Sequence, residues 1–254
     1  PHLVRIPAST EQRRMYNQVV QQYKQAAQTI SPSGKRSNPI LGMLHQLRAV
    51  CADPRPDGKQ PDLTLSVDEC RSRSPKMDWL IRLLDSLAAK NSAEKVLIFT
   101  EFLEMQRTLQ HYVGLRYKLR PRIINGAVKT DSRAPESRQK YIDEFQSSPG
   151  FNVLILSPIA AGFGLNIQAA NHVIHFTRPW NPAKEDQATD RAYRIGQRRD
   201  VSVYCPTIVA DDFLTFEEKL DQLLSQKRGL ANDMYNGTFD VAAEEFEELL
   251  NVQE

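Results

Sequence analysis

The sequence predicts an α/β fold, in which a parallel sheet carries helices on both faces. Short apolar segments rich in β-branched residues alternate with longer segments whose apolar residues recur at helical spacing. Two of the short segments, 151–156 and 172–176, are nearly continuous apolar runs, as expected of strands buried on both faces. Alternation of this kind implies right-handed crossovers between parallel strands. The chain has 254 residues, of which 41% are hydrophobic, so a sizeable core is possible.

Helices are predicted where apolar residues form one stripe. Met15, Val19 and Tyr23 share a stripe of the first helix, and Ser74-Pro75 opens a helix whose apolar face should lie on the sheet. The predicted helices, in chain order, are 10–30, 40–51, the helix from residue 75, and 213–230. The predicted strands are 96–100, 122–125, 152–156, 173–176 and 202–204. Between the first two helices, 31–38 is predicted to be a loop, and a Pro/Gly-rich linker follows at 53–62.

Three regions are expected along the chain: a helical lead-in and linker (1–74), the α/β lobe (75–210), and a bracing helix with an acidic tail (211–254). The tail, residues 240–254, holds six acidic residues and no basic ones, whereas the whole chain carries a net charge of +2. The remainder is therefore near +8, which is weakly consistent with a polyanionic partner. We favour a solvated tail over one that folds back on a basic surface.

The segment 186–197, DQATDRAYRIGQ, holds the most informative side chains. On a helix, Gln187, Asp190, Arg191 and Arg194 would project from one face, because they recur at intervals of three and four. Two guanidinium groups on one face suit a polyphosphate, since each offers a rigid fork of donors. A solvated, charged helix face remains the alternative for this pattern taken alone.

A glycine-containing loop precedes that segment. The strand 151–156 ends at Ser157-Pro158, and Gly162 and Gly164 follow. Glycine lets backbone amides approach an anion closely, and ligands of open α/β sheets bind at the carboxyl ends of strands. One candidate site is therefore formed by four consecutive segments: the strand 151–156, the glycine loop, the strand 172–176 and the arginine segment 186–197.

Residues 160–197, AAGFGLNIQ through RIGQ, resemble motifs V and VI of the Swi/Snf family of DNA-translocating ATPases in helicase superfamily 2. Ala161 departs from the family, which more often has glycine there. The segment 95–102 is similar to motif IV, and 124–126 with the helix ending at Phe145 is similar to the next family block. The N-terminal segments PASTEQRRMYNQVV and LHQLRAVCADP resemble the helices that lead into the second ATPase lobe.

The resemblance implies that the chain is the second, C-terminal RecA-like lobe of a two-lobed motor. The sequence contains no G-x-x-x-x-G-K-[ST] phosphate loop and no DExH run; Ser33-Gly34-Lys35 lacks the glycine and the buried strand that such a loop needs. ATP and Mg²⁺ are therefore expected to be held mainly by a first lobe absent from this chain. The full-length protein is expected to be a DNA-stimulated ATPase, and the isolated chain is expected to be inactive.

The resemblance also assigns roles to residues. Arg191 and Arg194 would be arginine fingers, Gln187 would orient the γ-phosphate or the attacking water, and Asp190 would hold an arginine in place. Coupling of the nucleotide to DNA is assigned to Gly162, Gly164 and Asn166. The candidate contacts to the DNA backbone are Thr100, Asn125, Gly126, Lys129, Ser157, Arg178 and Trp180. Trp180 would stack on the DNA or be buried under the arginine helix, and both alternatives stay open.

No metal site is expected in this chain. His172 and His175 lie three residues apart on a predicted strand, so they point to opposite faces and cannot easily share one ion. Three cysteines without paired spacing indicate reduced thiols and an intracellular protein, in the cytoplasm or nucleoid of a prokaryote or in a nucleus. No signal peptide and no membrane-spanning apolar run is present.

The expected partners are the backbone of double-stranded DNA, the first lobe of the same polypeptide and a DNA-bound protein complex, with no membrane. A different class of function, a non-catalytic module that binds DNA or protein through the same fold, is the alternative. The arginine pair favours the motor, because a protein that no longer hydrolyses ATP has no physical need for both arginines.

Overall fold

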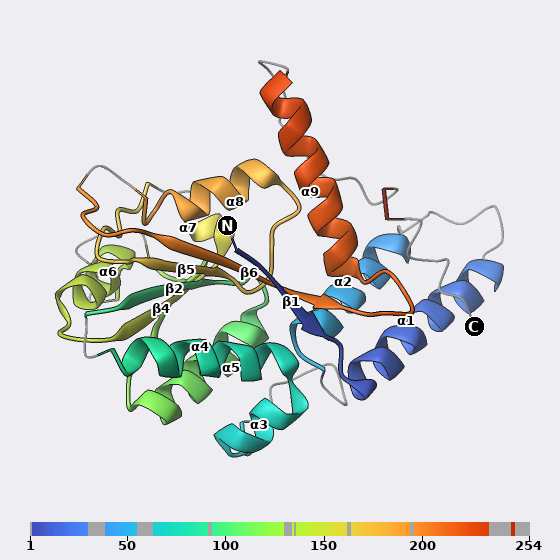
Figure 1. The fold of residues 1–254 in the computed structure, drawn as a ribbon, viewed down its shortest axis with the longest axis horizontal. Helices are drawn as coiled ribbons and strands as arrows, with labels where there is room; N and C mark the ends of the chain where they lie inside the picture. Colours follow the sequence, from blue (N-terminus) through green and yellow to red (C-terminus); the bar gives the residue numbers. More distant parts are fainter. Residues whose placement is uncertain are drawn as a thin grey trace.

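A single six-stranded parallel sheet forms the centre of the molecule (Figure 1). The computed structural model describes residues 2–29, 39–54, 63–90, 93–129, 134, 136–161, 164–193, 196–233 and 245–246. The strands are β1 (His2–Pro7), β2 (Lys95–Phe99), β3 (Arg122–Ile124), β4 (Asn152–Leu156), β5 (His172–His175) and β6 (Ser202–Val209), in the order β1-β6-β5-β2-β4-β3. The helices are α1 (Thr10–Thr29), α2 (Pro39–Ala52), α3 (Val67–Arg73), α4 (Pro75–Ala88), α5 (Leu103–Tyr117), α6 (Arg138–Ser147), α7 (Pro158–Ala161), α8 (Pro182–Thr189) and α9 (Phe216–Asp233). The predicted α/β fold is confirmed.

The central strands are buried on both faces, as their apolar sequences predict. All five residues of β2 are buried, and β2 pairs with β4 on one side and β5 on the other. The chain reaches β5 from β4 by passing across β2, so the direction of winding changes there. Ligands of open α/β sheets bind at the carboxyl ends of strands near such a change.

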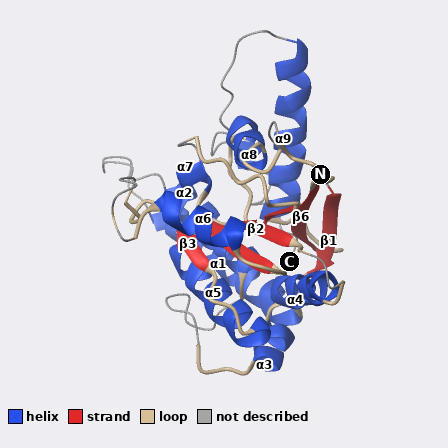
Figure 2. Cartoon of the chain, turned by 90° about the vertical axis from the view of Figure 1, so that its left-hand side faces the viewer, coloured by secondary structure: helices blue, strands red, loops and turns tan. Residues whose placement is uncertain are grey.

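Helices cover both faces of the sheet (Figures 1 and 2). On one face α4 and α5 contribute Leu80, Leu84 and Leu109 to a core with the strands. On the other face, Ile142 of α6 and Ala188 of α8 share a second core with strand residues. The apolar stripe predicted for α4 therefore lies on the sheet.

The N-terminal segment contributes a strand that the sequence analysis did not assign. β1 is an edge strand and pairs in parallel with β6, with His2 opposite Tyr204 and Pro7 opposite Val209. The segment HLVRIP is short and ends in proline, so it lacks the long apolar run of the central strands. A third core then joins α1, α2 and α9, with Tyr16, Leu44 and Leu224 buried.

The structure also differs from the predicted elements in several smaller ways. The helices α3 and α7 were not predicted, because seven and four residues are too short to show helical periodicity. β6 extends to Val209, beyond the predicted end at residue 204. The predicted loop 31–38, including Ser33–Lys35, and most of the linker 53–62 lie outside the described residues.

The acidic tail is described only at Glu245 and Phe246. Phe246 is fully buried against Trp180 and Phe216, and Glu245 pairs with Lys227 at 3.2 Å. The favoured expectation of a solvated tail is therefore wrong at these two positions. No helix of the described part is apolar over a length that would cross a bilayer.

Candidate functional site

The ends of four neighbouring strands bring the motif segments to one edge of the sheet. The backbone amide of Ser157 donates to the carbonyl of Ile124 at 2.9 Å, which joins the end of β4 to the end of β3. The amide of Thr100 donates to the carbonyl of Leu156 at 3.0 Å, which joins the end of β2 to that of β4. The carboxyl ends of parallel strands lie side by side, so motif segments far apart in sequence share one edge.

Two of the expected DNA contacts are turned inward. Thr100 is fully buried, and its hydroxyl accepts a hydrogen bond from the hydroxyl of Thr177 at 2.9 Å. Ser157 is buried, and its hydroxyl accepts from the amide of Ala160 at 3.2 Å, which begins α7. Both hydroxyls are therefore buried and bonded within the local structure.

The loop after β3 presents three of the candidates at the surface. Asn125 is half-buried; its amide group donates to Gln106 at 2.8 Å and its side-chain oxygen accepts from Ala127 at 3.0 Å. Gly126 and Lys129 are exposed, and a side chain added at Gly126 would meet nothing within 4 Å. Gly126 and Lys129 therefore face solvent, whereas the side chain of Asn125 is held by two hydrogen bonds.

The glycine loop after α7 packs against the arginine segment. Gly164 is exposed and has a φ of 71°, a left-handed conformation that favours glycine. Asn166 is exposed, and the amide of Ile167 donates to the carbonyl of Arg191 at 3.0 Å. Gly162 lies outside the described residues.

The helix α8 is shorter than the motif it carries. Asn181 accepts hydrogen bonds from the amides of Ala183 and Lys184, and Pro182 occupies the first turn, which together begin the helix. The helix ends at Thr189. The expectation that Gln187, Asp190 and Arg191 share one helix face is therefore wrong, since Gln187 and Asp190 are exposed whereas Arg191 is 5% exposed. Arg194 lies outside the described residues.

The guanidinium of Arg191 bridges the helix and the glycine loop. Nε donates to the carbonyl of Gln187 at 3.1 Å, and Nη1 donates to the carbonyl of Leu165 at 3.4 Å. A movement of the loop would therefore move this side chain.

Gly196 and Gln197 fasten the arginine segment to the end of the glycine loop, a role that the sequence analysis did not assign. The side-chain amide of Gln197 donates to the carbonyls of Gln168, Ala170 and Ala192 at 2.9, 2.7 and 3.2 Å. Gly196 has a φ of 105°, and an added Cβ would lie 2.8 Å from the side chain of Gln168. The Gly-Gln pair that closes the motif was the available signal, because glycine marks a close approach.

Replacement of Gln197 by alanine is expected to lower the free energy of unfolding by about 1–3 kcal/mol, because half-buried carbonyls on two segments lose their donor. Chemical denaturation would measure the loss. The matched control is Gln139→Ala, which removes an exposed amide bonded to Asp143. Equal stabilities of the two variants would contradict the fastening role.

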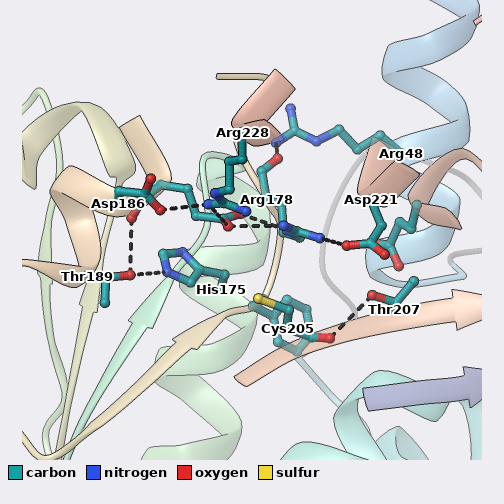
Figure 3. Close-up of polar contacts among 12 residues, drawn as sticks. Arg48, His175, Arg178, Asp186, Thr189, Cys205, Thr207, Asp221 and Arg228 are labelled. Carbon is teal, nitrogen blue, oxygen red and sulfur yellow. Dashed lines mark hydrogen bonds and ion pairs between the residues drawn. The ribbon is translucent and has the colours of Figure 1, made fainter. Parts of the chain in front are cut away.

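Arg178 belongs to a buried ion cluster and not to an open surface (Figure 3). Its guanidinium donates to Glu185 at 2.7 and 3.0 Å and pairs with Asp221 of α9. Burial would raise the pKa of Glu185, but hydrogen bonds and positive charge from Arg178 outweigh it and lower that pKa to about 2. A DNA contact would require Arg178 to leave two carboxylates, so this geometry favours a structural role over the predicted DNA contact.

Arg228 and Arg48 extend this cluster to neighbouring helices (Figure 3). Arg228 of α9 donates to Glu185 at 2.8 Å and to Asp186 at 2.6 Å, both on α8. Arg48 of α2 donates to the carbonyl of Arg178 and pairs with Glu101 after β2. Sequence reasoning missed this cluster because its members are scattered along the chain and only the fold brings them together.

Trp180 packs with aromatic side chains of the C-terminal region. Its ring centroid lies 5.8 Å from that of Phe216 and 5.2 Å from that of Phe246. Trp180 is half-buried against the core of α1, α2 and α9. Of the two alternatives that the sequence left open, the packing role is the one that this geometry favours.

The two histidines of β5 have separate partners. His172 Nε2 lies 2.8 Å from Glu94, and His175 Nε2 lies 2.8 Å from the hydroxyl of Thr189 at the end of α8. Burial lowers the pKa of His175 to about 4, so the ring is neutral at pH 7. Within the described ranges, no three His, Cys, Asp or Glu side chains are grouped to hold a metal ion.

The residues at this edge suit phosphate better than Mg²⁺. Gly164 supplies an exposed turn of backbone, and the guanidinium of Arg191 donates to the carbonyl of the next residue, Leu165, at 3.4 Å. A magnesium ion needs oxygen ligands, for which the described part of the edge offers no grouped carboxylates.

Comparisons with known proteins agree with the fold. Residues 75–196 match the helicase conserved C-terminal domain. Zorya protein ZorD of Escherichia coli O139:H28 is 46% identical over 239 residues, which are 94% of this chain and 21% of that protein. The putative ATP-dependent helicase/translocase YwqA of Bacillus subtilis is 34% identical over 250 residues, 97% of this chain and 25% of that protein. The chain thus spans a quarter or less of these relatives.

Solved structures show the same lobe. The SWI2/SNF2 ATPase core domain of Sulfolobus solfataricus matches with a TM-score of 0.73 and 30% identity, over 100% of this chain and 48% of that chain. The same core in complex with double-stranded DNA matches with a TM-score of 0.71 and 30% identity, over 100% and 50% of the two chains. The chain is a RecA-like C-terminal helicase lobe. It belongs to the Swi/Snf family of helicases.

Proposed function

We propose that the full-length protein is an ATP-driven translocase on double-stranded DNA, and that this chain is its second motor lobe. The observation that carries the proposal is the bonded contact between the glycine loop and the arginine segment at the carboxyl edge, Leu165 and Ile167 with Arg191. The relative YwqA is named a putative helicase/translocase, and the solved Sulfolobus core was bound to duplex DNA.

In this proposal, Arg191 and Arg194 neutralise the charge that builds on the transferring γ-phosphoryl group. Gln187, exposed on the last turn of α8, orients the γ-phosphate or the attacking water, and Asp190 holds an arginine in place. ATP supplies the phosphoryl group and Mg²⁺ neutralises its charge, both held mainly by the first lobe.

DNA is contacted by the loop after β3, through Asn125, Gly126 and Lys129. Such contacts position the duplex without reading its sequence. Closure of the two lobes around ATP would press on the glycine loop, with Gly162, Gly164 and Asn166, and the loop is bonded to the segment that follows α8. Nucleotide state and DNA position are thereby coupled through contacts within one edge of the sheet.

The proposal predicts that turnover requires both lobes. Full-length protein should release phosphate from ATP faster when duplex DNA of any sequence is added, whereas the 254-residue chain alone should show no turnover above the blank, because it has only part of the phosphate-binding apparatus. Phosphate release measures both. A full-length protein that binds duplex DNA but hydrolyses no ATP would contradict the motor and favour the non-catalytic module.

A further inference from the structure

A basic groove lies beside the edge strand β3, away from the nucleotide edge. It has a volume of about 590 Å³ and is lined by Leu63, Arg107, Gln110, His111, Leu119, Arg120, Pro121 and Arg122. Three of these side chains are permanently cationic and none is acidic. The groove belongs neither to the arginine segment nor to the ion cluster of Arg178.

The turn from α5 into β3 shapes the groove. Lys118 ends α5 with a φ of 54°, and the side-chain amide of Gln110 donates to the carbonyl of Pro121 at 2.7 Å. Gly114 lets the helix approach this turn closely, since an added Cβ would lie 3.2 Å from the carbonyl of Leu119. The walls of the groove are therefore fixed by packing and hydrogen bonds.

Two of the three groove cations are available to a ligand. Arg107 and Arg120 are exposed, and neither forms an ion pair with any described carboxylate. Arg122 is held in place by Glu144 at 3.0 Å and by the ring of Tyr141, whose centroid lies 4.6 Å from the guanidinium carbon. Within the described chain, Nε2 of His111 has no hydrogen-bond partner although it is shielded from solvent.

We infer that this groove binds the phosphodiester backbone of duplex DNA and extends the interface of the proposed translocase around the edge of the sheet. The inference rests on the proposed function and names a second part of its DNA contact. Guanidinium forks match phosphate oxygens two at a time, and the open groove offers no set of amide side chains aimed at base edges.

The position of the groove supports a continuous track. Arg122 begins β3 and Asn125 follows its end, so the groove lies about 10 Å from the surface loop of Asn125 and Gly126 along the strand. That spacing is comparable with the width of the major groove, about 12 Å. One duplex can therefore contact both places.

The test measures how DNA affinity depends on salt in the full-length protein. In Arg107→Gln/Arg120→Gln, loss of two phosphate contacts should reduce the slope of log affinity against log salt by about 2. ATP turnover without DNA should be unchanged, because neither arginine touches the nucleotide edge. The matched control is Arg5→Gln/Lys24→Gln, which removes the same charge from β1, at the opposite edge of the sheet, and from α1.

Each result is decisive for one of the two proposals. A reduced slope in the groove variant with an unchanged slope in the control supports the groove. If both variants keep the parental slope, or if the slope falls equally in both, the groove contact is refuted while the proposed translocase function is not. A parent protein that binds no duplex DNA refutes the proposed function. Polyglutamate that binds the parent but not the groove variant, without any effect on DNA binding, would show that the groove binds an acidic peptide. That result would overturn the inference.

Discussion

Replacing Arg191 by alanine in the full-length protein is expected to lower DNA-stimulated ATP turnover by about 10³- to 10⁵-fold. The guanidinium would no longer neutralise charge on the transferring phosphoryl group, and that charge develops only in the transition state. The maximal rate should therefore fall while the KM for ATP changes little. Steady-state phosphate release with saturating duplex DNA measures both parameters.

Because Arg191 is 5% exposed and bonded to Gln187 and Leu165, its removal also disturbs the loop. Arg191→Lys separates the two effects, since lysine keeps the charge but lacks the rigid fork. Thermal melts of both variants report the structural part. Turnover of Arg191→Ala equal to that of the parent, with the protein folded, would show that Arg191 is not a finger.

Replacing Glu185 by alanine is expected to lower the free energy of unfolding by about 3–5 kcal/mol. The carboxylate is 2% exposed and accepts hydrogen bonds from Arg178 and Arg228, so its loss removes one of two carboxylate partners from buried Arg178 and from half-buried Arg228. Chemical denaturation gives the loss. Arg82→Ala is the control, because it removes one member of an exposed pair with Asp78, and surface pairs contribute about 0–1 kcal/mol. Similar losses in the two variants would contradict the importance of the cluster.

The same carboxylate should impose a pH dependence. Its pKa falls from 4.5 to about 2 in the folded protein, so its stabilisation is present above pH 4.5 and is lost as pH falls from 4.5 towards 2. In Glu185→Gln this decline should be weaker than in the parent. His175, whose pKa is lowered to about 4 by burial, costs stability as pH falls from 6.5 towards 4. The charge of Glu185 raises that pKa, so this cost differs between the two proteins.

Most of the lobe could be predicted from the sequence, because its strands carry long apolar runs. The strand β4 begins and ends where expected, and the helix opened by Ser74-Pro75 lies on the sheet. β1 could not be predicted, since a six-residue edge strand needs only one buried residue, Ile6, and leaves Leu3 exposed. Its identity as a strand depends on a partner, β6, at the far end of the sequence.

The candidate site was predictable at the level of segments but not of side-chain direction. Motif spacing located the glycine loop and the arginine segment, and the fold brings them into contact. Spacing could not show that the helix stops at Thr189, nor that Arg178 meets Asp221 of α9. Side-chain direction depends on long-range packing, which a local pattern does not contain.

The parallel pairing of β1 with β6 also constrains how the protein folds during synthesis. Residues 2–7 leave the ribosome well before residues 204–209, which are their hydrogen-bonding partners. At a translation rate of about 5–20 residues per second, some 10–40 seconds separate the two strands. During that interval the emerging β1 has no sheet to join, and until it docks, the far edge of β6 is open to strands of other chains.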